Sequence, residues 1–195
     1  GKVKDGEIFD TNIKQEAKKI DLKIEARPLI ICIGQKMILP SIDDFLINKS
    51  LGKYSLELTP DKAFGERKRE LIQIMPSSVF KKQEIMPQPG MVFNFDNILG
   101  RISAVSGGRV IVDFNNPLSG KNIIYQLDIK RKIINLDEKI KTLIQFFFRI
   151  PLKYKLEENK LIIQGDKAFE SFSNLFKSKF KEILNLELEF EEEKE

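Results

Sequence analysis

The sequence contains no histidine and a single cysteine, Cys32. These absences exclude intramolecular disulfides, zinc sites built from Cys and His, and catalytic arrangements in which a histidine activates a nucleophile. Cys32 lies in the apolar run at residues 29–33, which Gly34 closes, and we expect it to be a small buried residue of a strand. A single cysteine also suits a reducing compartment, so we expect a cytoplasmic protein.

Long hydrophobic runs and a concentration of charge of one sign are also missing. No stretch approaches the roughly 20 apolar residues of a membrane-spanning helix, and no signal peptide is visible. The net charge is only +4, and the basic residues are scattered rather than interleaved with aromatics. We therefore expect neither a membrane nor a nucleic acid as a partner. The 195 residues, 42% hydrophobic and 32% charged, indicate a folded chain of one or two domains.

What the sequence does contain is a succession of short segments with clear periods. The polar turn at residues 4–6 predicts a hairpin end that enters a strand near Ile8. Residues 13–26 are charged and predict a loop or a frayed helical turn. Residues 40–47 predict a short helix with Ser41 as its N-cap and one apolar face. That face consists of Ile42, Phe45 and Leu46.

An alternating strand at residues 54–58 ends at a turn bounded by Pro60 and Gly65. The chain then leaves on a long excursion and returns through a second Gly/Pro-rich stretch at residues 113–121, after which residues 123–129 alternate again. This arrangement predicts a domain inserted between two strands of a host sheet. The insert is predicted to be mostly β, with strands at 71–75, 91–95, 100–105 and 109–114, a helix at 76–82 and a hairpin turn at 106–108.

From Leu136 onward the apolar period changes to that of a helix, for which Asp137 is a candidate N-cap. Two strands, a second helix from Asp166 and a final strand follow, so we expect a separate α/β module. Because so small a module has a limited core, it can complete that core with a second copy. The expected apolar stripes are Ile140, Leu143, Ile144 and Phe147 on the first helix and Phe169, Phe172, Phe176 and Phe180 on the second, and the strands are 152–156, 160–164 and 186–190.

Three groups of motifs together resemble the FKBP-type peptidyl-prolyl cis-trans isomerases. They are Gly-Glu-Ile-Phe-Asp-Thr at 6–11, the segment 27–52 from Arg-Pro-Leu through Pro40 to Gly52, and Pro-Asp-Lys-Ala-Phe-Gly-Glu-Arg at 60–67 with the returning stretch at 113–121. The resemblance is closest to the SlyD-like branch, in which a chaperone domain called insert-in-flap interrupts the catalytic domain. Long archaeal members also carry a C-terminal domain like residues 136–195.

The resemblance implies an α+β fold, with an FKBP-like antiparallel sheet wrapped on a short helix. Residues 1–67 and 113–135 would form the isomerase domain, residues 68–112 the mostly β insert-in-flap domain, and residues 136–195 a C-terminal α-β-β-α-β domain. It also implies that the protein binds proline-containing or unfolded polypeptides. The small core of the C-terminal module separately predicts a homodimer through that domain.

The same resemblance assigns site residues. It implies that Asp10, Phe64 and Tyr125 are catalytic. Residues implied to bind substrate are Phe9, Leu29, Ile38, Leu39 and Ile42, with the Leu39 backbone N–H binding a peptide carbonyl. Without the resemblance, most of the apolar residues in these sets would be read as core and Asp10 as a turn cap, so that alternative stays open.

Rotation about an X–Pro bond makes no new bond, so neither a cofactor nor a metal is needed. Four departures from the family pattern lower the expected catalytic efficiency. The family's first strand and its Tyr would precede Gly1, and Asn116 stands where the family has a histidine. Phe64 lacks the hydroxyl of the Tyr often found there, and Ile42 replaces a larger pocket floor.

Apolar and flexible side chains gather in the insert, where we expect a surface that holds unfolded segments. This predicted chaperone surface consists of Met75, Phe80, Met86, Met91 and Phe93. Packing of a small β core is the alternative explanation of the same residues. For the whole chain three functions stay open: an isomerase that is also a chaperone, a binding module with weak or no isomerase activity, and an assembly protein that dimerises through residues 136–195.

Overall fold

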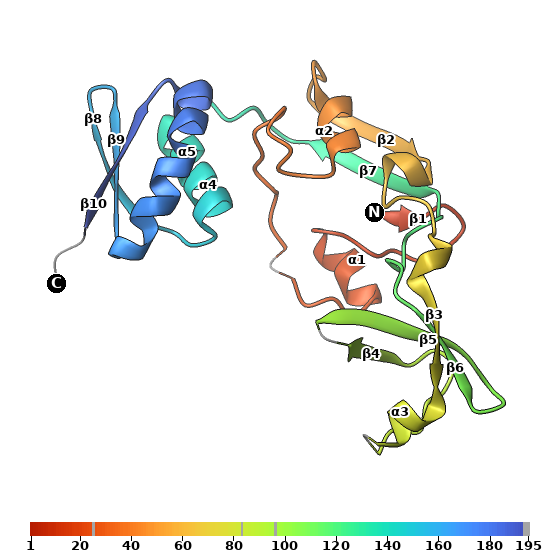
Figure 1. Ribbon diagram of the computed structural model, residues 1–195. Coiled ribbons are helices and arrows are strands. Elements are labelled where there is room, and N and C mark those ends of the chain that lie inside the picture. Colours follow the sequence, from red (N-terminus) through yellow and green to blue (C-terminus); the bar gives the residue numbers. More distant parts are fainter. Residues whose placement is uncertain (25, 83, 96, 193–195) are drawn as a thin grey trace. The chain divides into compact units, whose positions relative to one another are not determined.

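The computed structural model describes residues 1–24, 26–82, 84–95 and 97–192, in an α+β arrangement of small sheets and short helices (Figure 1). Within these residues the strands form three sheets, with orders β1-β7-β2, β3-β6-β5-β4 and β10-β9-β8. The chain divides into two units. The first comprises Gly1–Pro28 with Lys53–Asp128, and the second comprises Leu29–Gly52 with Ile129–Glu195.

The first sheet of the first unit contains β1 (Lys2–Val3), β7 (Ile123–Ile129) and β2 (Gly52–Leu58). β1 lies antiparallel to β7, and the predicted turn after β1 closes with a 3.1 Å bond from the Gly6 N–H to the Val3 carbonyl. Burial alternates along β2, as the sequence predicts for a strand with one covered face. The charged segment that follows β1 contains the short helix α1 (Lys14–Lys19), which confirms the predicted helical turn.

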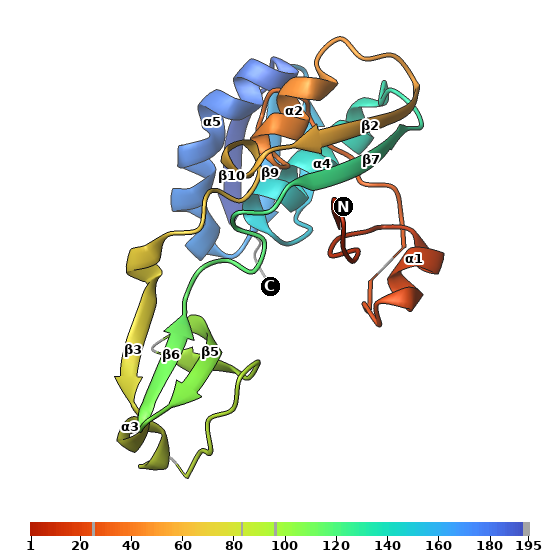
Figure 2. The same cartoon turned by 90° about the vertical axis from the view of Figure 1, so that its right-hand side faces the viewer.

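The insert forms the four-stranded antiparallel sheet of the same unit. Its elements are β3 (Ile72–Pro76), α3 (Ser77–Lys81), β4 (Val92–Phe95), β5 (Ile98–Ser106) and β6 (Arg109–Asp113), and α3 follows at the far end of β3 (Figure 2). The predicted segments are therefore confirmed to within one or two residues. One face of the sheet holds a core made of Phe80, Ile102, Val110 and Val112.

In the second unit, residues 136–192 form an α-β-β-α-β module, in the predicted order. It contains α4 (Leu136–Phe148), β8 (Lys153–Glu157), β9 (Lys160–Gly165), α5 (Glu170–Leu184) and β10 (Glu187–Glu192). β9 is central, antiparallel to β8 and parallel to β10. Both helices pack on the sheet face that carries Leu161, Ile163 and Leu188 (Figure 1). The core also contains Ile140, Leu143, Ile144, Phe148 and Phe180.

Both predicted helix N-caps are wrong. α4 is capped by Asn135, whose side-chain oxygen accepts the Glu138 N–H at 2.9 Å, because that position precedes the first helical residue. Helix α2 (Pro40–Leu46) begins after Leu39 and has no side-chain cap. Pro40 occupies its first turn, where the missing N–H of proline removes one of the donors that a cap would satisfy.

The predicted strand at residues 29–33 is also wrong, because within the described chain these residues pair with no strand. Leu29 and Ile33 are exposed, and the chain turns sharply after Cys32. The Cys32 N–H donates to the Met37 sulfur at 3.0 Å rather than to a neighbouring strand. Cys32 is consequently half-buried in a loop. An apolar run is ambiguous until a partner strand exists.

The phenylalanine stripe of the last helix is only partly core. Phe180 is buried and Phe176 packs against the core, but Phe172 is 52% exposed. Ser173, one position on, is fully buried instead, so the covered face is turned by about one residue from the predicted stripe. Phe169 lies before the helix, in the 3₁₀ turn η3 (Lys167–Phe169). This irregular start shifts the helical period relative to the sequence pattern.

Candidate functional site

Three of the predicted site residues form an aromatic cluster in the first unit. Phe9 contacts Phe64 edge-to-face at 5.7 Å between ring centroids and Tyr125 edge-to-face at 5.8 Å. These rings come from three distant parts of the chain, the segment after β1, the turn after the 3₁₀ helix η1 (Pro60–Lys62), and β7. Edge-to-face contacts of this kind are a favoured arrangement of aromatic pairs. The cluster therefore forms only when these distant segments pack together in the tertiary fold.

Backbone bonds to Gly1 hold the segment that carries Phe9 and Asp10. The Phe9 and Asp10 N–H groups both donate to the Gly1 carbonyl, at 3.0 and 3.3 Å. A Cβ on Gly1 would lie 2.8 Å from a Tyr125 ring carbon and 2.9 Å from a Phe9 ring carbon. Only glycine therefore allows the backbone to approach these two rings so closely.

The turn that presents Phe64 is fastened by the second Gly/Pro-rich stretch. Gly65 has φ +80° and donates its N–H to the Pro60 carbonyl at 2.7 Å, which closes the turn around Phe64. The Ser119 hydroxyl donates to the Phe64 carbonyl at 3.0 Å, and the Gly120 N–H donates to the Gly65 carbonyl at 2.9 Å. The two stretches singled out in the sequence therefore meet, and together they fix the ring of Phe64.

Asp10 adds a carboxylate beside the aromatic cluster. Burial of the phenol, the Asp10 charge and a hydrogen bond to that carboxylate raise the pKa of Tyr125 to about 12. The hydroxyl therefore stays protonated near neutral pH and donates to Asp10. Tyr125 is only 9% exposed, whereas Asp10 is exposed. The result is an oriented negative charge at the solvent side of an apolar group of rings.

The remaining predicted substrate-binding residues belong to the second unit. Ile42 is buried in α2, and Leu39, which precedes α2, is half-buried together with Ile38. The Leu39 carbonyl accepts the N–H groups of the first helical turn, so this residue is well fixed. Leu29 is exposed.

The structure corrects part of the predicted chaperone surface. Phe80 is 2% exposed and forms edge-to-face contacts with Phe93 and Phe95, so it is a core residue and does not reach the surface. Phe93 is half-buried for the same reason, and Met75 packs against this core as well. Helix α3 places Phe80 on the sheet, so for this residue the alternative explanation, packing of a small β core, is the correct one. Met86 and Met91 are exposed, as that prediction requires.

The opposite face of the insert sheet carries apolar residues that the sequence pattern did not reveal. Ile74 lies opposite Ile111, and residues directly opposite on neighbouring strands point to the same side. The alternate residues Met75 and Val110 point into the core, so Ile74 and Ile111 point outward. We call this the outer sheet face; its apolar members are Ile72, Ile74, Val92, Leu99, Ala104 and Ile111. Of these Ile74, Val92 and Leu99 are more than half exposed.

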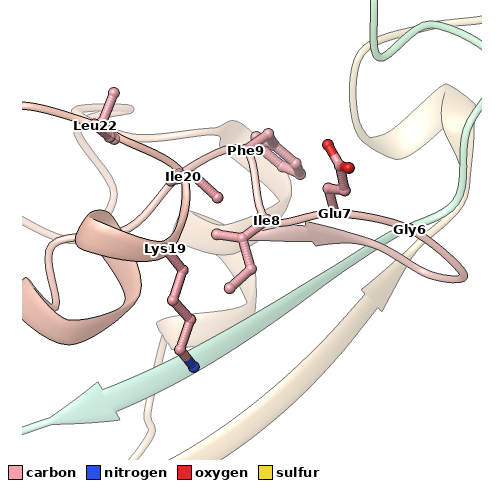
Figure 3. Close-up of a pocket in the computed structure, with 7 residues that line it drawn as sticks. All are labelled: Gly6, Glu7, Ile8, Phe9, Lys19, Ile20 and Leu22. Atoms are coloured by element: carbon pink, nitrogen blue, oxygen red, sulfur yellow. The ribbon is translucent and has the colours of Figure 1, made fainter.

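A cavity of about 610 Å³ lies next to the aromatic cluster and shares Phe9 with it (Figure 3). Ile8 and Phe9 line it from the segment after β1, and Lys19, Ile20 and Leu22 line it from the end of α1 and the following turn. Gly6 and Glu7 complete the lining. None of Asp10, Phe64 and Tyr125 lines this cavity, and Phe9 is the one lining residue that the family resemblance assigned to the site.

Two further searches concern metals and membranes. Among the residues that the structure describes, no group of three or more Cys, Asp or Glu side chains could hold a metal ion. In the same residues no helix combines the length and the apolar composition needed to cross a bilayer.

Comparisons with known proteins point to one family. A family profile described as "FKBP26, IF domain" matches residues 73–118. A short-type peptidyl-prolyl cis-trans isomerase of Methanocaldococcus jannaschii is 27% identical over 130 residues, which is 65% of this chain and 83% of the relative. A probable FKBP-type 16 kDa isomerase of Pseudomonas fluorescens is 27% identical over 56% of this chain and 76% of its own length. The FKBP-type isomerase SlyD of Aeromonas hydrophila is 27% identical over 64% of this chain and 55% of its own length.

Proposed function

We propose that this chain, which is similar to FKBP-type peptidyl-prolyl cis-trans isomerases, belongs to that family and catalyses rotation about X–Pro bonds in polypeptides. The observation that carries this proposal is the cluster of Phe9, Phe64 and Tyr125 with the Asp10 carboxylate bonded to the Tyr125 hydroxyl. All four are residues that the family motifs assign to the site.

The chemistry suits such a site. Rotation of an X–Pro bond crosses a barrier of roughly 20 kcal/mol because resonance keeps the amide planar. The twisted amide has less charge separation than the planar one, so an apolar surface favours it relative to water. The three rings supply that surface and grip the proline. The Asp10 carboxylate acts by electrostatics, orienting polar groups around the twisted carbonyl without transferring a proton.

The proposal keeps the other roles that the family resemblance implies. Ile38, Leu39 and Ile42 contact the substrate, the Leu39 N–H binds a peptide carbonyl, and Leu29 takes part in substrate binding. A cytoplasmic location belongs to the same proposal and is supported by the single cysteine, which leaves no intramolecular disulfide to form.

A protease-free exchange assay on a short Xaa-Pro peptide tests the isomerase directly. We expect the intact chain to accelerate exchange, and Asp10→Ala and Phe64→Ala each to lower kcat/KM about tenfold or more, or roughly 1.4 kcal/mol. Asp5→Ala, an exposed acid in the turn after β1, is the matched control and should change nothing. No acceleration by the intact chain would refute the isomerase and leave a binding module on an isomerase fold.

We further propose that the insert holds unfolded polypeptides, which the outer sheet face supports. Met86 and Met91 are exposed as well, and methionine adapts to varied partners. Apolar surface of this kind attracts the apolar side chains of unfolded chains without sequence preference. Tethering such chains raises their concentration near the isomerase site.

Aggregation of an unfolded reporter protein tests the insert. We expect the intact chain to suppress aggregation and Ile74→Ser combined with Leu99→Ser to lose most of that effect. The control is Ile134→Ser, the same change at an isoleucine that is more exposed but lies outside the insert. Equal suppression by both variants would rule out the outer sheet face as the holding surface. Isomerase activity on the short peptide should stay unchanged in both.

A homodimer through residues 136–195 is the last part of the proposal. Phe172 and Leu175 support it, because both are more than half exposed on α5 and isolated apolar side chains of that size gain from a partner. Sedimentation of the intact chain should give a dimer that Leu175→Glu converts to monomer, while Lys177→Glu on the same helix leaves it intact. A monomeric intact chain would exclude the dimer.

A further inference from the structure

A tightly built loop occupies residues 32–37 of the second unit, and we call it the anchor loop. Its shape depends on Asp43 of α2, which is 1% exposed. One carboxylate oxygen accepts the Gly34 N–H at 2.9 Å, and the other accepts the Lys36 N–H at 2.8 Å. Gly34 and Lys36 both have positive φ, which glycine adopts readily but lysine rarely does, so the bond from the Lys36 N–H holds that residue in an unfavourable conformation.

The anchor loop contacts the C-terminal module through apolar groups. Cys32 and Met37, at its two ends, both pack against the core formed by α4, α5 and the C-terminal sheet. The Met37 sulfur also accepts the Cys32 N–H, which joins the two ends. Burial, followed by the charges of Asp43 on α2 and Glu182 on α5, raises the pKa of the Cys32 thiol.

A polar bridge lies between these two apolar contacts. The Gln35 side-chain amide donates to a Glu182 carboxylate oxygen at 3.0 Å, and its oxygen accepts from the Lys179 ammonium at 3.2 Å. Lys179 and Glu182 are also paired with each other at 2.9 Å along α5. The N–H₂ group and the oxygen of the Gln35 amide therefore both bind side chains on one face of α5. These two bonds fix the position of the loop along the helix.

The anchor loop continues directly into Ile38, Leu39 and α2, the segment to which the proposed function assigns substrate contacts. We propose that the C-terminal module anchors this segment through Gln35, Lys179 and Glu182 and thereby sets its affinity for substrate. The module is then a positioning element of the isomerase as well as a site of assembly. The effect on substrate affinity rests on the proposed function. The anchoring of the loop to α5 is independent of it.

Hydrogen exchange of the intact chain tests the anchoring. In Gln35→Ala combined with Lys179→Ala we expect the Gly34 and Lys36 amides to exchange about tenfold faster, because two hydrogen bonds that hold the loop are lost. Lys177→Ala, an exposed lysine on the same helix, is the matched control and should leave exchange unchanged. Unchanged exchange in the double variant overturns the inference.

The second readout is the isomerase assay on the same variants. We expect the double variant to raise KM several-fold with kcat within about twofold, because the catalytic cluster of the first unit is untouched. Faster exchange with an unchanged KM would overturn the positioning role. An intact chain without isomerase activity would instead refute the proposed function, and the exchange result would still support or overturn the anchoring.

Discussion

Asp43 offers a sharp test of how the substrate segment is built, because its neighbour provides the control. Asp43 is buried and accepts two backbone N–H groups, whereas Asp44 is exposed on the same helix. Each bond to a charged acceptor contributes about 1.5–3 kcal/mol. Asp43→Ala removes both bonds, a loss of about 3–6 kcal/mol. Relaxation of the strained Lys36 backbone, at φ +52°, recovers about 1 kcal/mol, so the net loss of stability is about 2–5 kcal/mol.

The assay has to be local, because a chain of two units need not unfold in a single step. Amide exchange at Gly34 and Lys36 reports the opening of the loop itself. At 1.36 kcal/mol per tenfold, the expected loss accelerates exchange about 30-fold to 5,000-fold in Asp43→Ala. Asp44→Ala should stay within about twofold of the parent chain, as surface substitutions usually do. Equal exchange in the two variants would refute the assignment of the loop to Asp43.

Two further predictions concern the first unit. Gly100→Ala places a Cβ 2.7 Å from side-chain atoms of Val112 and Phe114, so overpacking outweighs the gain in backbone stiffness and destabilises the insert by about 1–2 kcal/mol. Amide exchange of β5 and β6 checks this, and unchanged protection would contradict it. The raised pKa of Tyr125 stabilises the fold fully below pH 10.0, and that contribution is lost as pH rises to about 12. Solvent screening reduces this contribution to about 1 kcal/mol of the free energy of unfolding. Unfolding of the parent chain and of Tyr125→Phe between pH 9 and pH 12 tests the prediction, and an equal loss of stability in both would contradict it.

Much of the local structure follows from the sequence alone. The alternation along β2, the Gly-Gly hairpin between β5 and β6, and the order of elements in the C-terminal module are all set by neighbouring residues and are confirmed. Periodicity and turn chemistry depend on residues that are close in the sequence, so they can be recognised without knowledge of the tertiary structure. The family resemblance likewise assigned all three rings of the aromatic cluster, Phe9, Phe64 and Tyr125, to the site.

The tertiary structure decided everything that depends on a partner far along the chain. The run at residues 29–33 lacks a neighbouring strand and leads into a loop. In that loop the Met37 sulfur accepts the Cys32 N–H, and the Asp43 carboxylate accepts the Gly34 and Lys36 N–H groups. Phe80 is core because α3 closes over the sheet. The local residue pattern alone does not determine which face of a helix or sheet becomes buried. Burial depends on packing between segments that are distant in the sequence.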